Sequence, residues 1–334
     1  MKHLLPQRKQ YFKAALHTHS TISDGNVNPV KVKEAYKKKG YQILSLTDHE
    51  MCFAHPELND ERFLTLNGYE MMIYEDVARM NARTYHINFI SKSPANRWQH
   101  YHPNLRRYME GHEDELVFDE PYERVYSVEE VNRLIQKANE KGFFAVYNHP
   151  VWSLQNGRDY LDLKGLWGVE VFNNGAYRGG CEEDMCQCYH ELLREGNFLC
   201  PVAADDSHHL YEVGGGWVMI GAEELTYESV VKAMEQGDVY ASSGPKIHSV
   251  TVDGNTLRIT CSRAANVAYI TNGRENDRRF GSRIKPLTAA EFDLTKWKEG
   301  ITEEWREKAF FRLCVTDRNG KKAWTRAYYL KDLV

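Results

Sequence analysis

The segment AALHTHSTISDG, residues 14–25, combines a strand signal with a cluster of polar side chains. Its first residues are small and apolar, as in a strand that is buried on both faces. The strand then runs into His17 and His19, whose spacing of two places both imidazoles on one side of an extended chain. Asp24 follows in a loop that contains Gly25. We therefore expect a buried strand with metal-binding or catalytic groups at its carboxyl end.

Six further segments have the same short β-branched and aromatic character. The seven expected strands cover residues 14–20, 42–48, 64–73, 85–91, 143–149, 168–173 and 198–204. Helices are expected between several of them, at residues 29–39 after Asn28-Pro29, at 128–141 after a Ser127 and Glu130 capping box, and at 181–196. Alternating strands and helices predict a parallel sheet, either closed into a barrel or open and doubly wound.

The pattern changes after Ser243-Gly244-Pro245. Segments such as IHSVTV and TLRITC alternate with a period of two around turns rich in Asp, Asn and Gly, which predicts β-hairpins. We expect residues 1–245 to form one domain and residues 246–334 to form a small, mostly antiparallel β-domain. The polar and aromatic stretch at 92–126 interrupts the first domain and is expected to be an insert that acts as a lid.

Charge divides the chain in the same way. The 334 residues carry a formal charge of −4, with 25 Lys and Arg against 36 Asp and Glu up to residue 245, and 18 against 11 after it. No apolar run reaches the ~20 residues of a membrane helix, and the seven cysteines show no regular framework. We expect a cytoplasmic protein without disulfides and without a membrane partner; the oligomeric state is open.

Polar groups stand at or beside the ends of successive expected strands. They are His17, His19, Asp24, His49, Glu70, His86, His149, Asp206 and His208. Each alone has an ordinary explanation as a surface or core polar residue, but six imidazoles and three carboxylates in this pattern indicate a metal centre. Adjacent residues must point to opposite faces. We favour His49 over Asp48 as a ligand, and Asp206 with His208 over Asp205 with His209.

Five motifs then suggest a family. LHTHSTISDG at 16–25, SLTDHE at 45–50, NGYE at 67–70, NHP at 148–150 and DDSH at 205–208 together resemble the PHP (polymerase and histidinol phosphatase) family of metal-dependent phosphoesterases, over about residues 12–243. The resemblance implies an α/β fold with a distorted, seven-stranded (βα)7 TIM-like barrel, followed here by a small β-sandwich-like domain. The chain departs from the family pattern at Ala15 and at Ala204-Asp205, and neither departure removes a ligand.

The resemblance also implies a trinuclear ligand set. His17, His19, Glu70 and Asp206 would surround one ion, Asp24, His49 and His208 would hold a second, and Glu70 would bridge to a third bound by His86 and His149. Imidazole and carboxylate ligands suit Zn, Mn or Fe, so two or three divalent ions of open identity are expected. The third site depends on His86, whose match to the family pattern is the weakest among these ligands.

The expected activity is hydrolysis of a small-molecule or nucleotide phosphoester by a metal-bridging hydroxide. The catalytic set is His17, His19, Asp24, His49, Glu70, His149, Asp206 and His208. Two alternatives stay open. One is a hydrolase of another bond, a carboxylic ester or an oligonucleotide phosphodiester, and the other is a metal-stabilised binding protein without turnover.

Residues that contact the substrate are less evident from the sequence. Arg178 follows the sixth strand, and Trp152 follows His149-Pro150, so both are substrate-binding candidates. Arg106 and Arg107 of the insert are further candidates. Gly214-Gly215-Gly216 lacks the Lys of a phosphate-binding loop and is interpreted as a flexible loop. Cys181, Cys186, Cys188 and His190 lack zinc-site spacing and are expected to pack on a helix.

Overall fold

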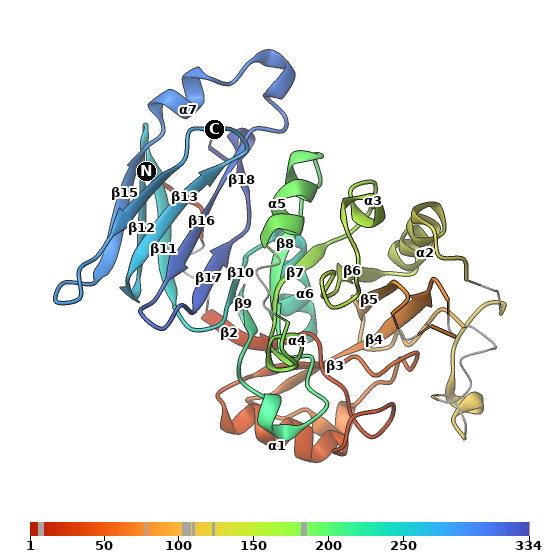
Figure 1. Cartoon of the computed structure of the whole chain (residues 1–334). Helices are drawn as coiled ribbons and strands as arrows, with labels where there is room; N and C mark the ends of the chain where they lie inside the picture. The colour runs from red at the N-terminus through yellow and green to blue at the C-terminus, as the bar shows by residue number, and fades with distance from the viewer. Residues whose placement is uncertain are drawn as a thin grey trace.

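The computed structural model describes the chain with a few internal gaps. The described residues are 1–5, 10–76, 78–79, 81–101, 108, 111–121, 124–181 and 186–333. Arg106 and Arg107 lie outside them. The fold is mixed α/β, with one large sheet, a second sheet of four strands and few helices (Figure 1).

Seven strands of the large sheet match the seven expected strands. They are β2 (Gln10–Ala15), β3 (Ile43–Leu46), β4 (Leu64–Tyr74), β5 (Thr84–Ser91), β6 (Phe143–Tyr147), β7 (Gly168–Asn173) and β8 (Cys200–Ala204), and they neighbour one another in this order. Their side chains are almost all buried, because the neighbouring elements cover both faces of the sheet.

The expectation of a uniformly parallel sheet is wrong at β5. This strand is antiparallel to both β4 and β6, whereas β2–β3, β3–β4, β6–β7 and β7–β8 are parallel pairs. The connection from β4 to β5 covers only residues 75–83, which is too short to return the chain for a parallel pairing. The start of β5 therefore lies at the same end of the sheet as the carboxyl ends of its neighbours.

The first and last of these seven strands meet beyond their regular ends. The backbone N–H of His19 donates to the carbonyl of Ser207 at 3.0 Å, and the N–H of Asp206 donates to the carbonyl of His17 at 3.1 Å. The earlier part of β2 pairs instead with β9 (Trp217–Ala222), which is antiparallel to it. The chain of β2 thus contacts two neighbours: its regular part pairs with β9, and residues 17–19 after it bond to residues 206–207 after β8.

Two of the three expected helices begin at the predicted residue and end within one residue of the predicted end. In α1 (Pro29–Lys38) the Asn28 side chain accepts a hydrogen bond from the N–H of Lys31, and in α2 (Val128–Glu140) Ser127 accepts one from the N–H of Glu130. The third expected helix corresponds to α5 (Cys186–Arg194), because residues 182–185 are outside the described chain. The remaining helices are α3 (Gly157–Tyr160), α4 (Asn174–Arg178), α6 (Tyr227–Gln236) and α7 (Thr295–Glu299), with 3-10 turns η1 (Pro56–Leu58), η3 (Glu113–Glu115), η4 (Leu210–Glu212), η5 (Glu303–Trp305) and η6 (Leu330–Leu333).

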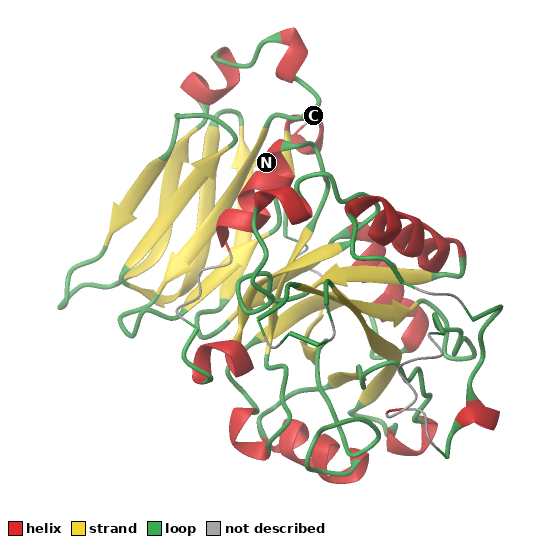
Figure 2. Cartoon of the chain, turned by 45° about the vertical axis from the view of Figure 1, so that its right-hand side comes forward, coloured by secondary structure: helices red, strands yellow, loops and turns green. Residues whose placement is uncertain are grey.

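The C-terminal part consists of two stacked antiparallel sheets (Figure 2). One contains β1 (Lys2–His3), β11 (Ile247–Asp253), β12 (Thr256–Ala264) and β15 (Leu287–Asp293). The other continues the large sheet through β9, β10 (Val239–Ser242), β17 (Lys322–Thr325), β16 (Phe310–Thr316), β13 (Asn266–Thr271) and β14 (Asp277–Phe280), with β18 (Tyr328–Tyr329) on β16. The expected hairpins β11–β12 and β16–β17 are both present.

The N-terminal residues contribute to the core between these two sheets. β1 pairs with β11, and Leu5, which is only 2% exposed, packs in a cluster with Val250, Leu257 and Phe311. Because β10 pairs with β17, the large sheet is continuous from strands β2–β8 into this sandwich. Among the helices that the structure describes, none has both the length and the apolar character needed to cross a lipid bilayer.

Truncating Leu5 tests whether the N-terminal residues stabilise the sandwich. Leu5→Ala removes buried methyl groups and leaves a cavity, so we expect the free energy of unfolding to fall by about 2–5 kcal/mol. Ile284→Ala is the matched control, because Ile284 is 95% exposed, and it should change stability by less than about 0.5 kcal/mol. Urea denaturation followed by tryptophan fluorescence measures both. Equal effects of the two variants would contradict this packing.

Candidate metal centre

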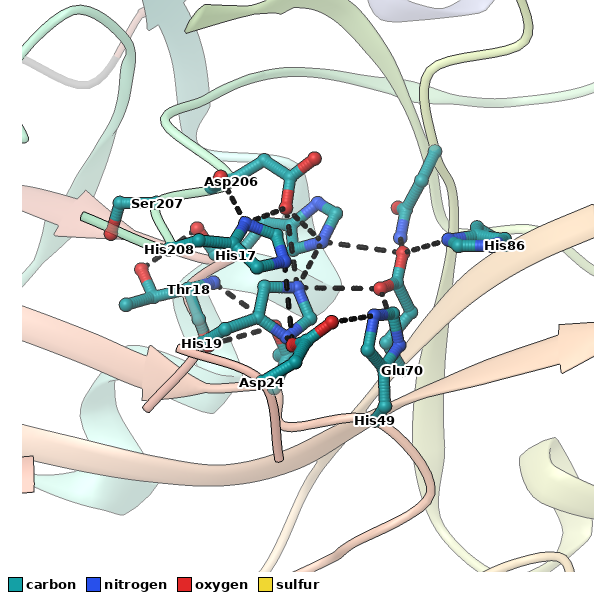
Figure 3. Close-up of polar contacts among 12 residues, drawn as sticks. His17, Thr18, His19, Asp24, His49, Glu70, His86, Asp206, Ser207 and His208 are labelled. Atoms are coloured by element: carbon teal, nitrogen blue, oxygen red, sulfur yellow. Dashed lines mark hydrogen bonds and ion pairs between the residues drawn. The ribbon is translucent and has the colours of Figure 1, made fainter. Parts of the chain in front are cut away.

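The nine predicted side chains converge at one end of the large sheet (Figure 3). Their ligand atoms form four overlapping groups, and within each group the atoms lie within 4.8 Å of one another. These groups are His19, Asp24, His49 and His208; His17, Glu70 and His149; His17, His19 and Asp206; and His49, Glu70 and His86. Because the groups share members, they form one continuous cluster of imidazole nitrogens and carboxylate oxygens.

Glu70 occupies the middle of this cluster and is 1% exposed. Its carboxylate oxygens lie 3.1–3.4 Å from imidazole nitrogens of His17, His19, His49, His86 and His149. Asp206 is a second shared carboxylate, with one oxygen 3.2 Å from both His17 Nε2 and His19 Nε2. Asp24 is a third, at 3.4 Å from His208 and 3.5 Å from His49.

Local backbone geometry explains how separate strands deliver these groups. His17 and His19 follow β2 with the predicted spacing of two, and their Nε2 atoms are 3.2 Å apart. His86 is the third residue of β5 and not its last, but the antiparallel direction of β5 brings its start to this end of the sheet. His149 and Asp206 have positive φ angles of 23° and 48°, a strained conformation that occurs preferentially at functional sites.

The charges of the cluster are mutually stabilising. Burial lowers the pKa of His17, but the carboxylates of Asp206, Glu70 and Glu170 outweigh burial and raise this pKa well above its usual range. The same balance between burial and the carboxylates of Asp206 and Glu70 raises the pKa of His19 to about 10. Burial raises the pKa of Glu70, but the surrounding imidazoles lower it by more. The pKa therefore lies well below its usual range, and Glu70 is ionised. Only histidine protons or bound cations can balance such a buried group of carboxylates.

The donor set fits divalent ions. His86 Nε2 is buried without a hydrogen-bond partner in the described structure, and burial lowers the pKa of His86 to about 4 even though Glu70 opposes this change. A neutral imidazole is the form that binds a metal, and the His86 nitrogen that faces Glu70 is Nδ1, at 3.1 Å from Oε1. Mixed imidazole and carboxylate oxygen donors suit Zn, Mn and Fe.

The two adjacent carboxylates that we placed outside the ligand set have other contacts. Asp48 accepts hydrogen bonds from the N–H and hydroxyl of Ser20, at 2.7 and 2.8 Å, and from the hydroxyl of Ser23 at 2.8 Å. It therefore fixes the loop that carries Asp24. Asp205 points to the opposite side, where it accepts a hydrogen bond from the Tyr41 hydroxyl at 3.2 Å.

The interpretation of Gly214-Gly215-Gly216 as a flexible loop is wrong. All three N–H groups donate to the Asp205 carboxylate at 2.7–2.9 Å, and burial raises the pKa of Asp205 to about 6 despite these hydrogen bonds. A Cβ on Gly215 or Gly216 would overlap Asn174 or the backbone of Ala204. The glycines therefore allow close packing around a buried carboxylate.

Sequence reasoning missed Glu170, which is fully buried beside the cluster. Its Oε1 accepts a hydrogen bond from His17 Nδ1 at 2.6 Å, and its Oε2 accepts one from the N–H of His149 at 3.0 Å. This pairing turns His17 Nε2 toward Glu70 and Asp206. The signal was available in GVEVFN, residues 168–173, where an acidic residue interrupts an otherwise apolar strand.

Three further residues with amide or ion-pair contacts, Asn148, Asn173 and Arg124, were also missed. Asn148 Nδ2 donates to Glu70 at 2.7 Å, and Asn173 Nδ2 donates to both Glu170 and Asp206 at 3.0 and 3.1 Å. Arg124 of the insert forms a bidentate, buried ion pair with Glu50 at 2.6 and 2.7 Å. This pair connects the insert to the residue that follows His49.

The two substrate-binding candidates differ in position. Trp152 is 49% exposed, and its ring lies edge-on to His149 and His86, with centroid distances of 5.1 and 5.4 Å. Arg178 ends α4 and packs its guanidinium 5.2 Å from the ring of Tyr211. The structure therefore brings Trp152 into the cluster and Arg178 to its periphery. Cys188 and Tyr189 are buried on α5, and the metal-type groups of the described chain do not include the cysteines.

Replacing Glu170 tests the electrostatic coupling within the cluster. Because the Glu170 carboxylate raises the pKa of His17, we expect Glu170→Gln to lower that pKa, so that His17 loses its proton at a lower pH. NMR titration of the histidine ring signals in metal-free protein measures this change. Glu191→Gln is the control, because Glu191 contacts Tyr160 on α3. An unchanged or higher pKa for His17 in Glu170→Gln would contradict the coupling.

Comparisons with known proteins gave similar folds and no sequence match. The chain matches no protein-family profile and no curated protein. A two-domain protein from Bacteroides vulgatus that contains a predicted PHP-like metal-dependent phosphoesterase is 17% identical, with 98% of each chain covered and a TM-score of 0.47. A lesion-specific endonuclease from Pyrococcus furiosus is 16% identical over 68% of this chain and 56% of its own, with a TM-score of 0.41. An amidohydrolase from Chromobacterium violaceum is 19% identical over 59% and 87%, with a TM-score of 0.39.

Proposed function

We propose that the protein is a metal-dependent hydrolase that cleaves a phosphoester, with two or three divalent ions held by the nine clustered side chains. The observation that carries this proposal is the buried Glu70 carboxylate, which lies within 3.4 Å of nitrogens from five histidines. A purely structural role needs no such concentration of ionisable groups, since burying them is costly. A carboxylate surrounded by imidazoles is the donor arrangement of a multinuclear site.

Each proposed metal site contains at least one of the carboxylates of Glu70, Asp206 and Asp24. Asp206 and Glu70 with His17 and His19 would hold the first ion, and Asp24 with His49 and His208 the second. Glu70 Oε1 lies 3.1 Å from His86 Nδ1 and 3.4 Å from His149 Nε2, which supports a third site between these residues. The ions would lower the pKa of a shared water and stabilise the charge that develops on the phosphoryl oxygens.

The protein's own groups would orient these ligands and shape the site. Glu170 accepts from His17 Nδ1, and the Ser153 hydroxyl lies 3.1 Å from His149 Nδ1, so both rings present Nε2 to the centre. The half-exposed Trp152 forms an aromatic wall beside His86 and His149.

The same proposal extends to the architecture. We propose that β2–β8 form a distorted barrel within residues 1–245, that residues 246–334 form a second domain, and that the insert at 92–126 is a lid. The hydrogen bonds between residues 17–19 and 206–207 support closure of the barrel, and the Arg124–Glu50 ion pair supports anchoring of the insert beside His49.

Removing one ligand tests the function. Asp206→Asn keeps the size of the side chain but removes its charge, so we expect loss of bound metal and a fall in kcat/KM of more than about 100-fold. Metal content by mass spectrometry and activity are measured on one preparation, with phosphomonoesters, phosphodiesters, short oligonucleotides and carboxylic esters as substrates. Asp162→Asn, at an exposed position, is the control.

The substrate panel separates the alternatives. Hydrolysis of carboxylic esters alone would refute phosphoester cleavage, and bound ions with no hydrolysis across the panel would favour a binding protein. Full activity and metal content in Asp206→Asn would refute the proposed centre.

Metal binding should release protons. The carboxylates around His17 and His19 raise the pKa of both imidazoles, that of His19 to about 10, so the metal-free cluster holds imidazolium charge at pH 7, whereas a metal requires neutral imidazoles. We expect Zn²⁺ to displace at least about one proton at pH 7, and the apparent affinity to rise as the pH increases. Calorimetric titration in buffers of different ionisation enthalpy measures the number of protons. Release of none would contradict the charge state inferred here.

A further inference from the structure

A small cavity lies where α4 meets the turn between β16 and β17. Its volume is about 130 Å³, and its lining includes the aromatic rings of Phe172, Tyr177 and Trp324 together with Lys321 and Lys322. Lys321 Nζ lies 5.4 Å from the ring centre of Tyr177 and 5.5 Å from that of Phe172. The cavity therefore combines aromatic surface with two cationic side chains.

The cavity is close to the metal centre through α4. The N–H of Gly175 at the start of this helix donates to the carbonyl of Asp205 at 2.8 Å, and Asn173 just before it donates to the carboxylate of Asp206 at 3.1 Å. The helix has five residues, which corresponds to a length of about 7 Å. Tyr177 is thus within about one helical turn of the backbone beside Asp206.

Further exposed aromatic rings and a cation lie on α4 and η4, near the centre. Tyr177 and Tyr211 are 52% and 63% exposed. The Arg178 guanidinium lies 5.2 Å from the Tyr211 ring, which stacks on His209 at 5.0 Å and 14°. His209 follows the ligand candidate His208, and Lys321 lies beside Tyr177, so these rings and cations occur next to the centre and at the cavity. We refer to Tyr211, Arg178, Tyr177, Lys321 and Lys322 as the track.

The charge distribution matches a polyanion. Residues 246–334 contain 18 Lys and Arg against 11 Asp and Glu, in contrast to the acidic residues 1–245. Asp317 is the carboxylate of the β16–β17 turn, and it accepts hydrogen bonds from the N–H groups of Asn319 and Lys321 at 2.8 and 2.9 Å. It thus stabilises the turn that presents Lys321. The β-domain therefore brings positive charge to the edge of a site in the acidic part of the chain.

We propose that this track, formed by Tyr211, Arg178, Tyr177, Lys321 and Lys322, binds the nucleotides next to the scissile bond of a single-stranded oligonucleotide. Planar bases stack on exposed aromatic rings, and backbone phosphates pair with neighbouring cations, which is the alternation found along the track. The inference rests on the proposed function, because it places the scissile phosphodiester at the metal centre. The inference predicts that the substrate is a single strand longer than one nucleotide.

Binding of a fluorescein-labelled hexathymidylate by anisotropy tests the track independently of turnover. Lys321→Ala/Lys322→Ala should raise the Kd about tenfold and reduce the slope of log Kd against log salt by about 1.4, which is 0.7 for each lost contact with a single strand. Tyr177→Ala should raise the Kd about tenfold, whereas Tyr177→Phe keeps the ring and should bind as the wild type does. Lys296→Ala is the control, because Lys296 is exposed on α7 at the far end of the β-domain (Figure 1).

Kinetics connect the track to the reaction. The ratio of kcat/KM for hexathymidylate to that for the p-nitrophenyl ester of thymidine 5′-monophosphate should fall about tenfold in the double lysine variant. An unchanged Kd and salt slope, or equal competition by inorganic polyphosphate, would overturn the inference. Wild-type hydrolysis of the small ester without any preference for the hexamer would overturn it as well and leave the proposed function intact. Absence of hydrolysis with tight, lysine-dependent binding would refute the proposed function alone.

Discussion

The buried carboxylate of Glu70 sets the main constraint on this molecule. An ionised carboxylate that is 1% exposed is tolerated only where opposite charge or strong hydrogen bonds surround it. Here the compensation comes from imidazoles on β2, β3, β5 and β6 or the residues directly after these strands, together with the amide of Asn148. Three strands must therefore end, and β5 must begin, at nearly the same point in space, and a shift of any one would weaken this compensation.

Several unusual backbone features satisfy this constraint. The reversed strand β5 brings its first residues, including His86, to the end where its neighbours finish. Positive φ angles occur at His149 and Asp206, and both side chains contribute ligand atoms to the cluster. Around them, Glu170 accepts a hydrogen bond from His17, and Asn173 donates one to Asp206. Asp48 fixes the loop that carries Asp24.

Much of this arrangement could be predicted from the sequence because it depends on local periodicity. Alternation along a strand separated His49 from Asp48, and the spacing of His17 and His19 put both rings on one side, as the structure shows. Non-local contacts could not be predicted in this way. The direction of β5 depends on the length of one connection, and the contact of Glu170 with His17 joins residues 153 positions apart. The glycines at 214–216 were misinterpreted because glycine permits both mobility and close packing, and only the position of Asp205 distinguishes the two.

The continuous sheet has a consequence for how the chain folds during synthesis. Strands β9 and β10 form the edge on which β17 pairs, and β17 is made some eighty residues after β10. The N-terminal strand β1 pairs with β11, and the number of residues between these two strands is larger still. Until then the nascent chain exposes an unpaired strand edge and the apolar inner face of the sandwich, a state that favours aggregation. Such long sequence separation slows folding, so a nascent chain of this protein depends on protection from self-association until its last strands have emerged from the ribosome.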